Sequence, residues 1–422
     1  MDIQKIAQEY EKLRKEKFQF LLGNGENISF SFSKSDFYHL LGFKKFTDVT
    51  IVKMIEAKVF EKKTFYDKVL KGEITYDKVN VDIKNMERFV QDDCIINFSD
   101  AVVTDKTSLV INNRFPYFTY DNMKLLLSTD WIILYDKDKA PLQYKLECDK
   151  FFSKLQEDKG RNLYFFIRKA KEHDNQCPVS FFLEQEWNSY IDIWEQGQKK
   201  EQEKVRILMR CVRDYNTNKE KEIVVYWDRV RQANSSSKFF RAQKHLRQYF
   251  HSTVYSSSLK IEIENLKRDK ECEISLLNER EVELEIKNLI EEYYNIEDQE
   301  RKLQIAERLL DEYYIDIMMN EKNSMSTRAI SSIEQDILEI KKKITKLNSR
   351  IKKYQKYYPE IEQLEIEEVR MVYSCLWEDF AKCEEKFIRY LINDKNIYSN
   401  NMSSMEIRKE YKQWKQGAGN VL

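Results

Sequence analysis

The feature that most constrains this chain is a heptad pattern in its C-terminal half. Large aliphatic residues follow one another in alternating steps of three and four, which places them on one stripe of a helix. This isoleucine seam consists of Ile330, Ile333, Ile337, Ile340, Ile344, Leu347 and Ile351. An apolar stripe of this kind must be covered by another helix, so the pattern predicts a coiled coil.

A second pattern upstream supplies a helix that can cover the seam. Within a charged helical stretch, apolar residues recur every seven positions at Val282, Leu289, Ile296, Leu303 and Leu310. The polar segment NEKNSMST separates the two patterns, and Pro359 is expected to end the second helix. We therefore predict an antiparallel hairpin over residues 259–358. Because isoleucine at both seam positions favours higher oligomers, a homo-oligomer through the same residues is the alternative.

Composition narrows the remaining classes. The chain has only 8 glycines and 4 prolines in 422 residues, which argues against propellers, sandwiches and glycine-rich nucleotide folds. Lys+Arg and Asp+Glu both number 72, so no overall field attracts nucleic acid or an anionic membrane. No apolar run is long enough to span a membrane and the first residues are charged, so we expect a cytoplasmic protein. The seven cysteines form no CxxC pair. We expect reduced thiols, no metal site and no cofactor.

The first 198 residues have a different pattern. Helical spacing from Ile3 to about Leu22 is followed by ISFSFSK, whose alternation predicts a strand, and then by short helices to about Asn97. After Asp105, short runs rich in aromatic and β-branched residues predict an antiparallel meander of about four strands. These runs are SLVIN, WIILYD, LQYKLE, NLYFFIRK and PVSFFLE. The fold class predicted for residues 1–198 is therefore α+β, an N-terminal helical layer with a small antiparallel sheet.

The remainder is expected to be all-α and rich in coiled coil. We divide it into a basic and aromatic helical connector over residues 199–258, the hairpin over residues 259–358, and a C-terminal helical segment over residues 359–422.

Several of the N-terminal strings resemble a known family. FSFSKSDFYHLLGF, WIILYD, NLYFFIRK and SFFLE, in this order and at about these separations, are similar to the phage-borne barnase, EndoU, colicin and RelE-like nucleases, the BECR fold. The stretch between Thr104 and Asp130 matches poorly, so the resemblance assigns no role to Arg114. It implies a helical part followed by an antiparallel sheet, and a metal-independent ribonuclease activity.

Such a ribonuclease needs a base for the ribose 2′-hydroxyl, an acid for the leaving oxygen and a cation for the phosphate. His39, inside the FYHLLG string, is the first candidate for the proton transfers, since the ordinary pKa of histidine lies near working pH. Arg168 at the end of NLYFFIRK supplies a cation, and Ser180 or Tyr190 a hydrogen bond. The competing interpretation is that His39 is a packing histidine among Phe37 and Leu40.

A basic and aromatic stretch follows the predicted sheet. Its cations can contact phosphates and its rings can stack on bases, which suggests RNA binding. The candidate residues are Arg231, Lys238, Phe240, Arg241, Lys244 and Arg247. The alternative is an amphipathic helix that packs its aromatic residues inward and leaves its cations in water.

Three functional hypotheses follow. The first is a phage or mobile-element ribonuclease whose helical arm engages RNA. The second is a non-catalytic binding protein that inhibits a host protein or ribonucleoprotein complex through the same arm, and the third is a structural coiled-coil oligomer.

Overall fold

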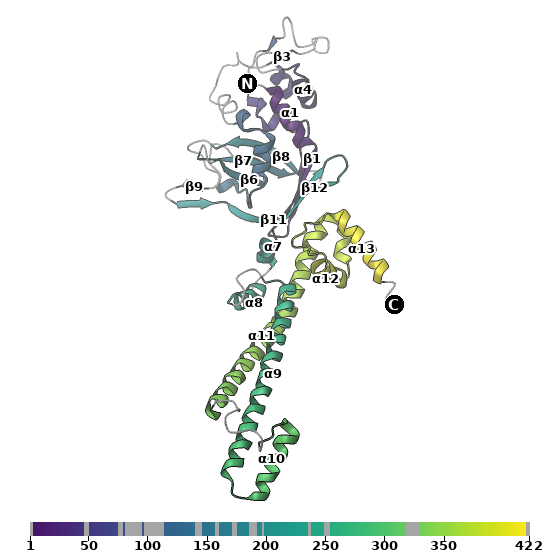
Figure 1. Cartoon of the computed structure of the whole chain (residues 1–422). Coiled ribbons are helices and arrows are strands. Elements are labelled where there is room, and N and C mark those ends of the chain that lie inside the picture. Colours follow the sequence, from purple (N-terminus) through teal and green to yellow (C-terminus); the bar gives the residue numbers. More distant parts are fainter. Residues whose placement is uncertain are drawn as a thin grey trace. The chain divides into compact units, whose positions relative to one another are not determined.

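The computed structural model describes residues 3–45, 50–74, 79–80, 95–96, 114–139, 146–156, 160–170, 175–184, 192–195, 198–234, 238–248, 254–317 and 329–418. The chain divides into two compact units (Figure 1). The sheet unit comprises Met1–Asn234 and Glu368–Leu422, and the helical unit comprises Ser235–Glu367.

The centre of the sheet unit is an eight-stranded antiparallel sheet. Seven strands run in the order β2-β1-β11-β5-β6-β7-β8, and β12 also pairs with β11. Their bounds are β1 Glu16–Leu22, β2 Asn27–Ser31, β5 Trp131–Leu134, β6 Lys150–Gln156, β7 Arg161–Lys169, β8 Gln176–Leu183, β11 Glu203–Asp214 and β12 Glu220–Val225. The two end strands, β2 and β8, lie against each other, so the sheet curls towards a barrel. Two short pairs lie outside this sheet, β3 (Val79–Asn80) with β4 (Ile95–Ile96) and β9 (Asp192–Glu195) with β10 (Gln198–Glu201).

The predicted opening helix is too long. Helix α1 (Ile3–Arg14) ends early, and the chain turns at once into β1, which pairs with β2 and β11. Phe18 and Phe20 lie within the range predicted to be helical, but they alternate along β1 and are fully buried. A strand lined with aromatic residues buries them when it has partners on both sides, and this non-local pairing overrides the local helical pattern.

The predicted connector at residues 199–258 is also wrong for its first part. Residues 203–225 form β11 and β12 of the main sheet instead of a helix. β11 pairs with β1 through residues 207–214 and with β5 through residues 203–206. Its residues 207–212 are all buried, as expected of a central strand. The sheet therefore extends well beyond residue 198.

The strand predictions further along the chain are mixed. WIILYD, NLYFFIRK and PVSFFLE are confirmed as β5, β7 and β8. The sequence reading missed β6, which precedes β7, and most of LQYKLE, like SLVIN, lies outside the described residues.

A layer of short helices covers one face of the sheet. α1 packs on α4, α2 packs on β8 and α4, and α6 packs on β6 and β7. Besides α1, the layer contains α2 Asp36–Leu40, η1 Phe43–Lys45, α3 Thr50–Glu56, α4 Lys62–Leu70, η4 Phe115–Tyr117 and α6 Tyr120–Leu126; the short η5, Lys137–Lys139, follows β5. One core joins these helices to the sheet, with rings such as Tyr10, Phe30 and Phe165 at its centre. The predicted fold class, a helical layer with an antiparallel sheet followed by an all-α half, is confirmed.

The C-terminal segment of the sheet unit packs back on the sheet. It contains η6 (Glu378–Lys382), α12 (Glu385–Asn393) and α13 (Ser404–Ala418). Gln19 of β1 donates to the carbonyl of Cys375 at 2.9 Å, and the Ser404 hydroxyl donates to Glu220 of β12 at 2.7 Å. The segment predicted as a separate region after residue 358 is therefore divided between the two units.

The helical unit contains α8 (Lys238–Arg247), α9 (Ser256–Asn295), α10 (Gln299–Tyr313) and most of α11 (Ile330–Leu376). α9 and α11 lie side by side and antiparallel (Figure 1). Ion pairs join Glu262 to Arg350 and Glu281 to Lys341 across them. No described helix is long and apolar enough to cross a membrane.

The predicted upstream heptad is broken. α9 ends at Asn295, and Asp298 caps α10 by accepting from the backbone N–H of Glu300 at 2.9 Å. Leu289 is buried, but Leu303 and Leu310 are about half exposed at 53% and 50%. A favourable N-cap can start a new helix where a heptad continues in the sequence.

The isoleucine seam is covered within the chain. Ile333, Ile337, Ile340 and Ile351 are buried. At its C-terminal end, Ile351 belongs to an apolar cluster with Leu259, Ile263 and Leu266 of α9. Most of the seam residues that were predicted to form a homo-oligomer are therefore buried by contacts within the chain.

Pro359 does not end the second helix, contrary to the prediction, since α11 continues to Leu376. A proline in a helix removes one hydrogen bond and crowds the preceding turn, at a cost of about 3 kcal/mol. Tyr354, Ile361 and Ile366 on either side of it are buried, and their burial offsets this cost.

Candidate functional site

The helix that carries His39 is short and tightly held. α2 buries Phe37, Tyr38 and Leu40 in the core of the sheet unit. It ends at Leu40, and the following Gly42 has a left-handed φ of +76° and donates its N–H to the His39 carbonyl at 3.0 Å. The packing fixes the direction in which the His39 side chain leaves the helix.

His39 is half-buried and is hydrogen-bonded to a lysine. Its Nε2 lies 2.6 Å from Nζ of Lys62, the first residue of α4. An ammonium group can only donate, so Nε2 accepts this bond and the ring proton of the neutral imidazole is on Nδ1. The hydrogen-bond partner of His39 is therefore a charged side chain from α4.

The environment keeps this imidazole neutral. Partial burial lowers the pKa of His39, and the positive charges of Lys62, Lys44 and Arg168 lower it further, to about 4. Glu56 acts in the opposite direction, with a smaller effect than Lys62 or Lys44. At neutral pH, His39 is therefore a proton acceptor surrounded by cations, which we call the basic cluster (His39, Lys44, Lys62 and Arg168).

Two further contacts position the Lys62 side chain. Its ammonium group lies 5.5 Å from the centre of the Tyr38 ring. The Tyr38 hydroxyl donates to Glu56 of α3 at 3.0 Å, and burial together with this bond raises the pKa of Tyr38. In the described residues, neither Lys62 nor Lys44 forms an ion pair with a carboxylate, so their charges are available to an anion.

Arg114 holds the end of α2. It is 8% exposed, its Nη1 donates to the Leu40 carbonyl at 2.9 Å, and its guanidinium lies 5.5 Å from the Phe182 ring centre of β8. A cation at a helix C-terminus is favourable because the last carbonyls carry partial negative charge. Arg114 thus fixes the helix that presents His39, although it lies in the stretch with the poorest resemblance.

The four residues predicted as catalytic are not all brought together. Arg168, at the end of β7, is exposed, forms a 3.8 Å ion pair with Glu147 and contributes to the field at His39. Ser180 of β8 is 5% exposed and lies opposite Phe166 of β7. In the described part of the chain, no hydrogen bond joins Ser180 to His39. Tyr190 lies outside the described residues.

Sequence reasoning missed Lys62 and Lys44. Both are surface-type residues in short helices, and a lysine that contacts a histidine 23 residues away leaves no local pattern. The only available signal was position in the sequence, since Lys44 directly follows the FYHLLGF string.

One of the residues predicted to bind RNA is buried. Arg231 belongs to α7 (Trp227–Asn234), and its side chain is only 2% exposed. Its Nε lies 3.1 Å from the Glu368 carboxylate, and the guanidinium lies 4.6 Å from the Tyr398 ring centre. A buried guanidinium paired in this way cannot reach an RNA phosphate at the surface, so the prediction that Arg231 binds RNA is wrong.

The other cations of the basic stretch are exposed. Lys238, Arg241, Lys244 and Arg247 all lie on the solvent side of α8. Phe240 lies in the same helix, but its side chain is outside the described part.

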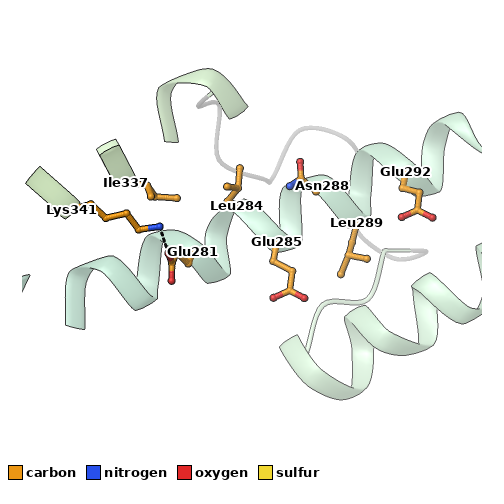
Figure 2. Close-up of a pocket in the computed structure, with 8 residues that line it drawn as sticks. All are labelled: Glu281, Leu284, Glu285, Asn288, Leu289, Glu292, Ile337 and Lys341. Carbon is orange, nitrogen blue, oxygen red and sulfur yellow. Dashed lines mark ion pairs between the residues drawn. The ribbon is translucent and has the colours of Figure 1, made fainter. Parts of the chain in front are cut away.

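A cavity of about 310 Å³ lies in the helical unit, where α9 faces the start of α11 (Figure 2). It is lined by Glu281, Leu284, Glu285, Asn288, Leu289, Glu292, Ile337 and Lys341. Its three carboxylates have cationic partners, Lys341 at 2.7 Å, Arg308 at 2.5 Å and Arg301 at 3.0 Å. The charges of the three carboxylates that line the cavity are therefore compensated. Among the described residues, no group of three or more His, Cys, Asp or Glu side chains is arranged to hold a metal ion.

Comparison with known proteins identifies the N-terminal part. The family described as phage-Barnase-EndoU-ColicinE5/D-RelE like nuclease4 matches residues 2–244, a range that includes every strand of the main sheet and the whole basic cluster. No curated protein and no solved structure matches the chain. Since the match covers more than half of the 422 residues, the chain belongs to the phage-Barnase-EndoU-ColicinE5/D-RelE like nuclease4 family.

Proposed function

We propose that this nuclease-family chain cleaves RNA without a metal ion, with the basic cluster as its active site. The observation that carries the proposal is the half-buried His39 hydrogen-bonded to Lys62, with its pKa lowered further by the charges of Lys44 and Arg168. A proton acceptor next to several positive charges is the combination that cleavage by the ribose 2′-hydroxyl requires.

The reaction can be balanced with these groups. Nε2 of His39 takes the proton of the 2′-hydroxyl, and the 2′-oxygen forms a bond to phosphorus. The bond from phosphorus to the 5′-oxygen breaks, and the ammonium group of Lys62 donates a proton to that oxygen. The products are a 2′,3′-cyclic phosphate and a 5′-hydroxyl. The proton then returns from His39 to Lys62 through the hydrogen bond that joins them.

Substrate binding prepares His39 for this role. In the free protein the Nε2 lone pair is occupied by Lys62. A phosphate beside the cluster attracts the Lys62 ammonium group and releases Nε2. The added negative charge also raises the pKa of His39, which makes it a stronger base. Arg168, exposed and only loosely paired with Glu147, neutralises charge on the phosphate.

The test is cleavage of a fluorescent RNA in EDTA, with analysis of the product ends. Wild type should produce 2′,3′-cyclic phosphate ends and should leave an RNA with 2′-O-methyl groups intact. His39→Ala and Lys62→Ala should each reduce kcat/KM by about 10²–10⁴-fold.

Lys63→Ala is the matched control, since Lys63 is the exposed neighbour of Lys62 in α4 and should keep activity within about twofold. Thermal unfolding of each variant separates loss of chemistry from loss of fold. If the folded wild type does not cleave RNA in EDTA, or if His39→Ala cleaves normally, the proposal is wrong. The first outcome would favour the non-catalytic binding hypothesis.

A further inference from the structure

The region around α8 has a local charge that the balanced chain as a whole lacks. Asp and Glu number 72 among 422 residues, yet none occurs between Asp228 and Glu262. Within this region, the ten residues of α8 carry four lysines and arginines. An acid-free basic segment in a neutral chain produces a local positive field.

The cations of α8 differ from those of α9 and α11. Along the long helices, several basic side chains pair with carboxylates of the facing helix, as Lys343 does with Glu273 at 3.5 Å, whereas α8 lies in a stretch without Asp or Glu. Lys238, Lys244 and Arg247 are exposed and make no ion pair or hydrogen bond with any residue that the structure describes. Their charges are therefore uncompensated at short range.

The packing of α8 holds these charges in place. Ala242 and Leu246 are buried in an apolar cluster with Leu259 and Tyr354. Gln243, also buried, lies on the same side of the helix. The basic side is therefore fixed towards solvent, and a polyanion that binds it orders only the lysine and arginine side chains.

Aromatic rings lie next to these cations. The exposed His245 ring is stacked on Tyr357 of α11, with 6.0 Å between ring centres and 14° between ring planes. Cations that contact a phosphate backbone beside rings that can stack on bases are typical of single-strand nucleic-acid surfaces, whereas an acidic protein would need the cations alone.

We propose that this surface of α8, formed by Lys238, Lys244, His245 and Arg247, binds the backbone of single-stranded RNA. The inference adds a binding site to the proposed ribonuclease function and rests on it for the choice of RNA. It is tested with an RNA that the enzyme cannot cleave, so binding by α8 and cleavage at His39 can fail separately.

The experiment measures fluorescence anisotropy of a labelled 2′-O-methyl RNA of about twelve nucleotides, within the usual site sizes of single-strand binders, over a range of salt concentrations. The triple variant Lys238→Gln/Lys244→Gln/Arg247→Gln removes three charges from α8. If each contacts one phosphate, the slope of log K against log salt should decrease in magnitude by about 2. The affinity at low salt should fall at least about tenfold.

The matched control is Lys346→Gln/Lys352→Gln/Lys356→Gln, which removes three exposed charges from α11 of the same unit. It should leave the salt slope unchanged. The proposal is overturned if both triple variants weaken binding equally, or if neither does. It is also overturned if poly-glutamate of similar length competes as well as unlabelled RNA, since the surface would then be a general site for acidic partners.

Discussion

The cores of the two units are built in different ways. In the sheet unit, rings from distant parts of the chain meet in three dimensions, as where Phe30 of β2 contacts Phe18, Phe152 and Phe165. In the helical unit, the core is a narrower apolar strip shared by α8, α9 and α11, and ion pairs such as Glu281–Lys341 lie between α9 and α11. The first core encloses its aromatic rings, while the ion pairs between α9 and α11 in the second unit are partly exposed to water.

This difference shows where each unit can support chemistry. The three-dimensional core fixes α2 firmly enough to hold a half-buried histidine against a lysine. The strip can hold helices together, but it leaves most side chains of those helices in water. The first unit is therefore suited to a catalytic site and the second to contacts along its surface.

The largest effect is expected for Phe30→Ala. Phe30 is 1% exposed and is enclosed by aromatic neighbours, so its removal leaves a cavity and should lower the free energy of unfolding by about 4 kcal/mol. Denaturation in urea measures this change. Leu155→Ala, at a 51% exposed position of the same sheet, is the control and should cost less than about 0.5 kcal/mol. A cost below about 1.5 kcal/mol for Phe30→Ala would show that this core is loosely packed.

A second test asks whether a buried ion pair acts like part of that core. Arg231→Met leaves the Glu368 carboxylate buried without its guanidinium partner and should cost about 3 kcal/mol. Replacing both partners, in Arg231→Met/Glu368→Leu, should recover most of the loss, as measured by denaturation. If the double variant is no more stable than the single one, the pair contributes through its specific geometry rather than through compensation of charge.

Truncating a buried side chain in the apolar strip of the helical unit should lower the free energy of unfolding by less than Phe30→Ala does. Ile340 is 4% exposed, but Ile340→Ala removes a smaller side chain than Phe30→Ala does, so we expect a cost of about 2 kcal/mol. Leu338→Ala, 47% exposed on the same helix, should be nearly neutral. A cost for Ile340→Ala equal to that of Phe30→Ala would remove the distinction between the two cores.

The smallest effect concerns pH. The pKa of His39 in the folded protein is about 4, below the ordinary value of 6.5 in the unfolded chain. Above pH 6.5 both states are neutral, so His39 contributes no pH dependence there. As the pH falls from 6.5 to 4, the unfolded chain takes up the proton first and stability is lost.

His39→Gln removes this titration and keeps an acceptor for Lys62. Wild type should lose on the order of 1 kcal/mol more than the variant between pH 7 and 4, after allowance for solvent screening. Thermal unfolding at both pH values measures the difference. Equal losses in the two proteins would mean that His39 is not held neutral by its surroundings.

Local patterns in the sequence predicted a good part of the fold. The alternation of ISFSFSK, the apolar runs of β5, β7 and β8 and the isoleucine seam each correspond to an observed element. Errors occurred where distant partners decided the outcome. Phe18 and Phe20 are in a strand because β11, almost two hundred residues away, lies beside them, and Pro359 is tolerated because buried neighbours hold the helix.

In the candidate site, too, local patterns were predictable and contacts between distant residues were not. The sequence by itself determined the periodic elements, the family resemblance and the position of His39 in a short helix, since each depends on residues close together in the chain. Only the tertiary structure decided that Lys62, Lys44 and Arg168 surround His39, that Arg114 holds its helix and that Arg231 is buried. The physical reason is that a charge acts through space, so its effect on a pKa depends on distances that no spacing in the sequence contains.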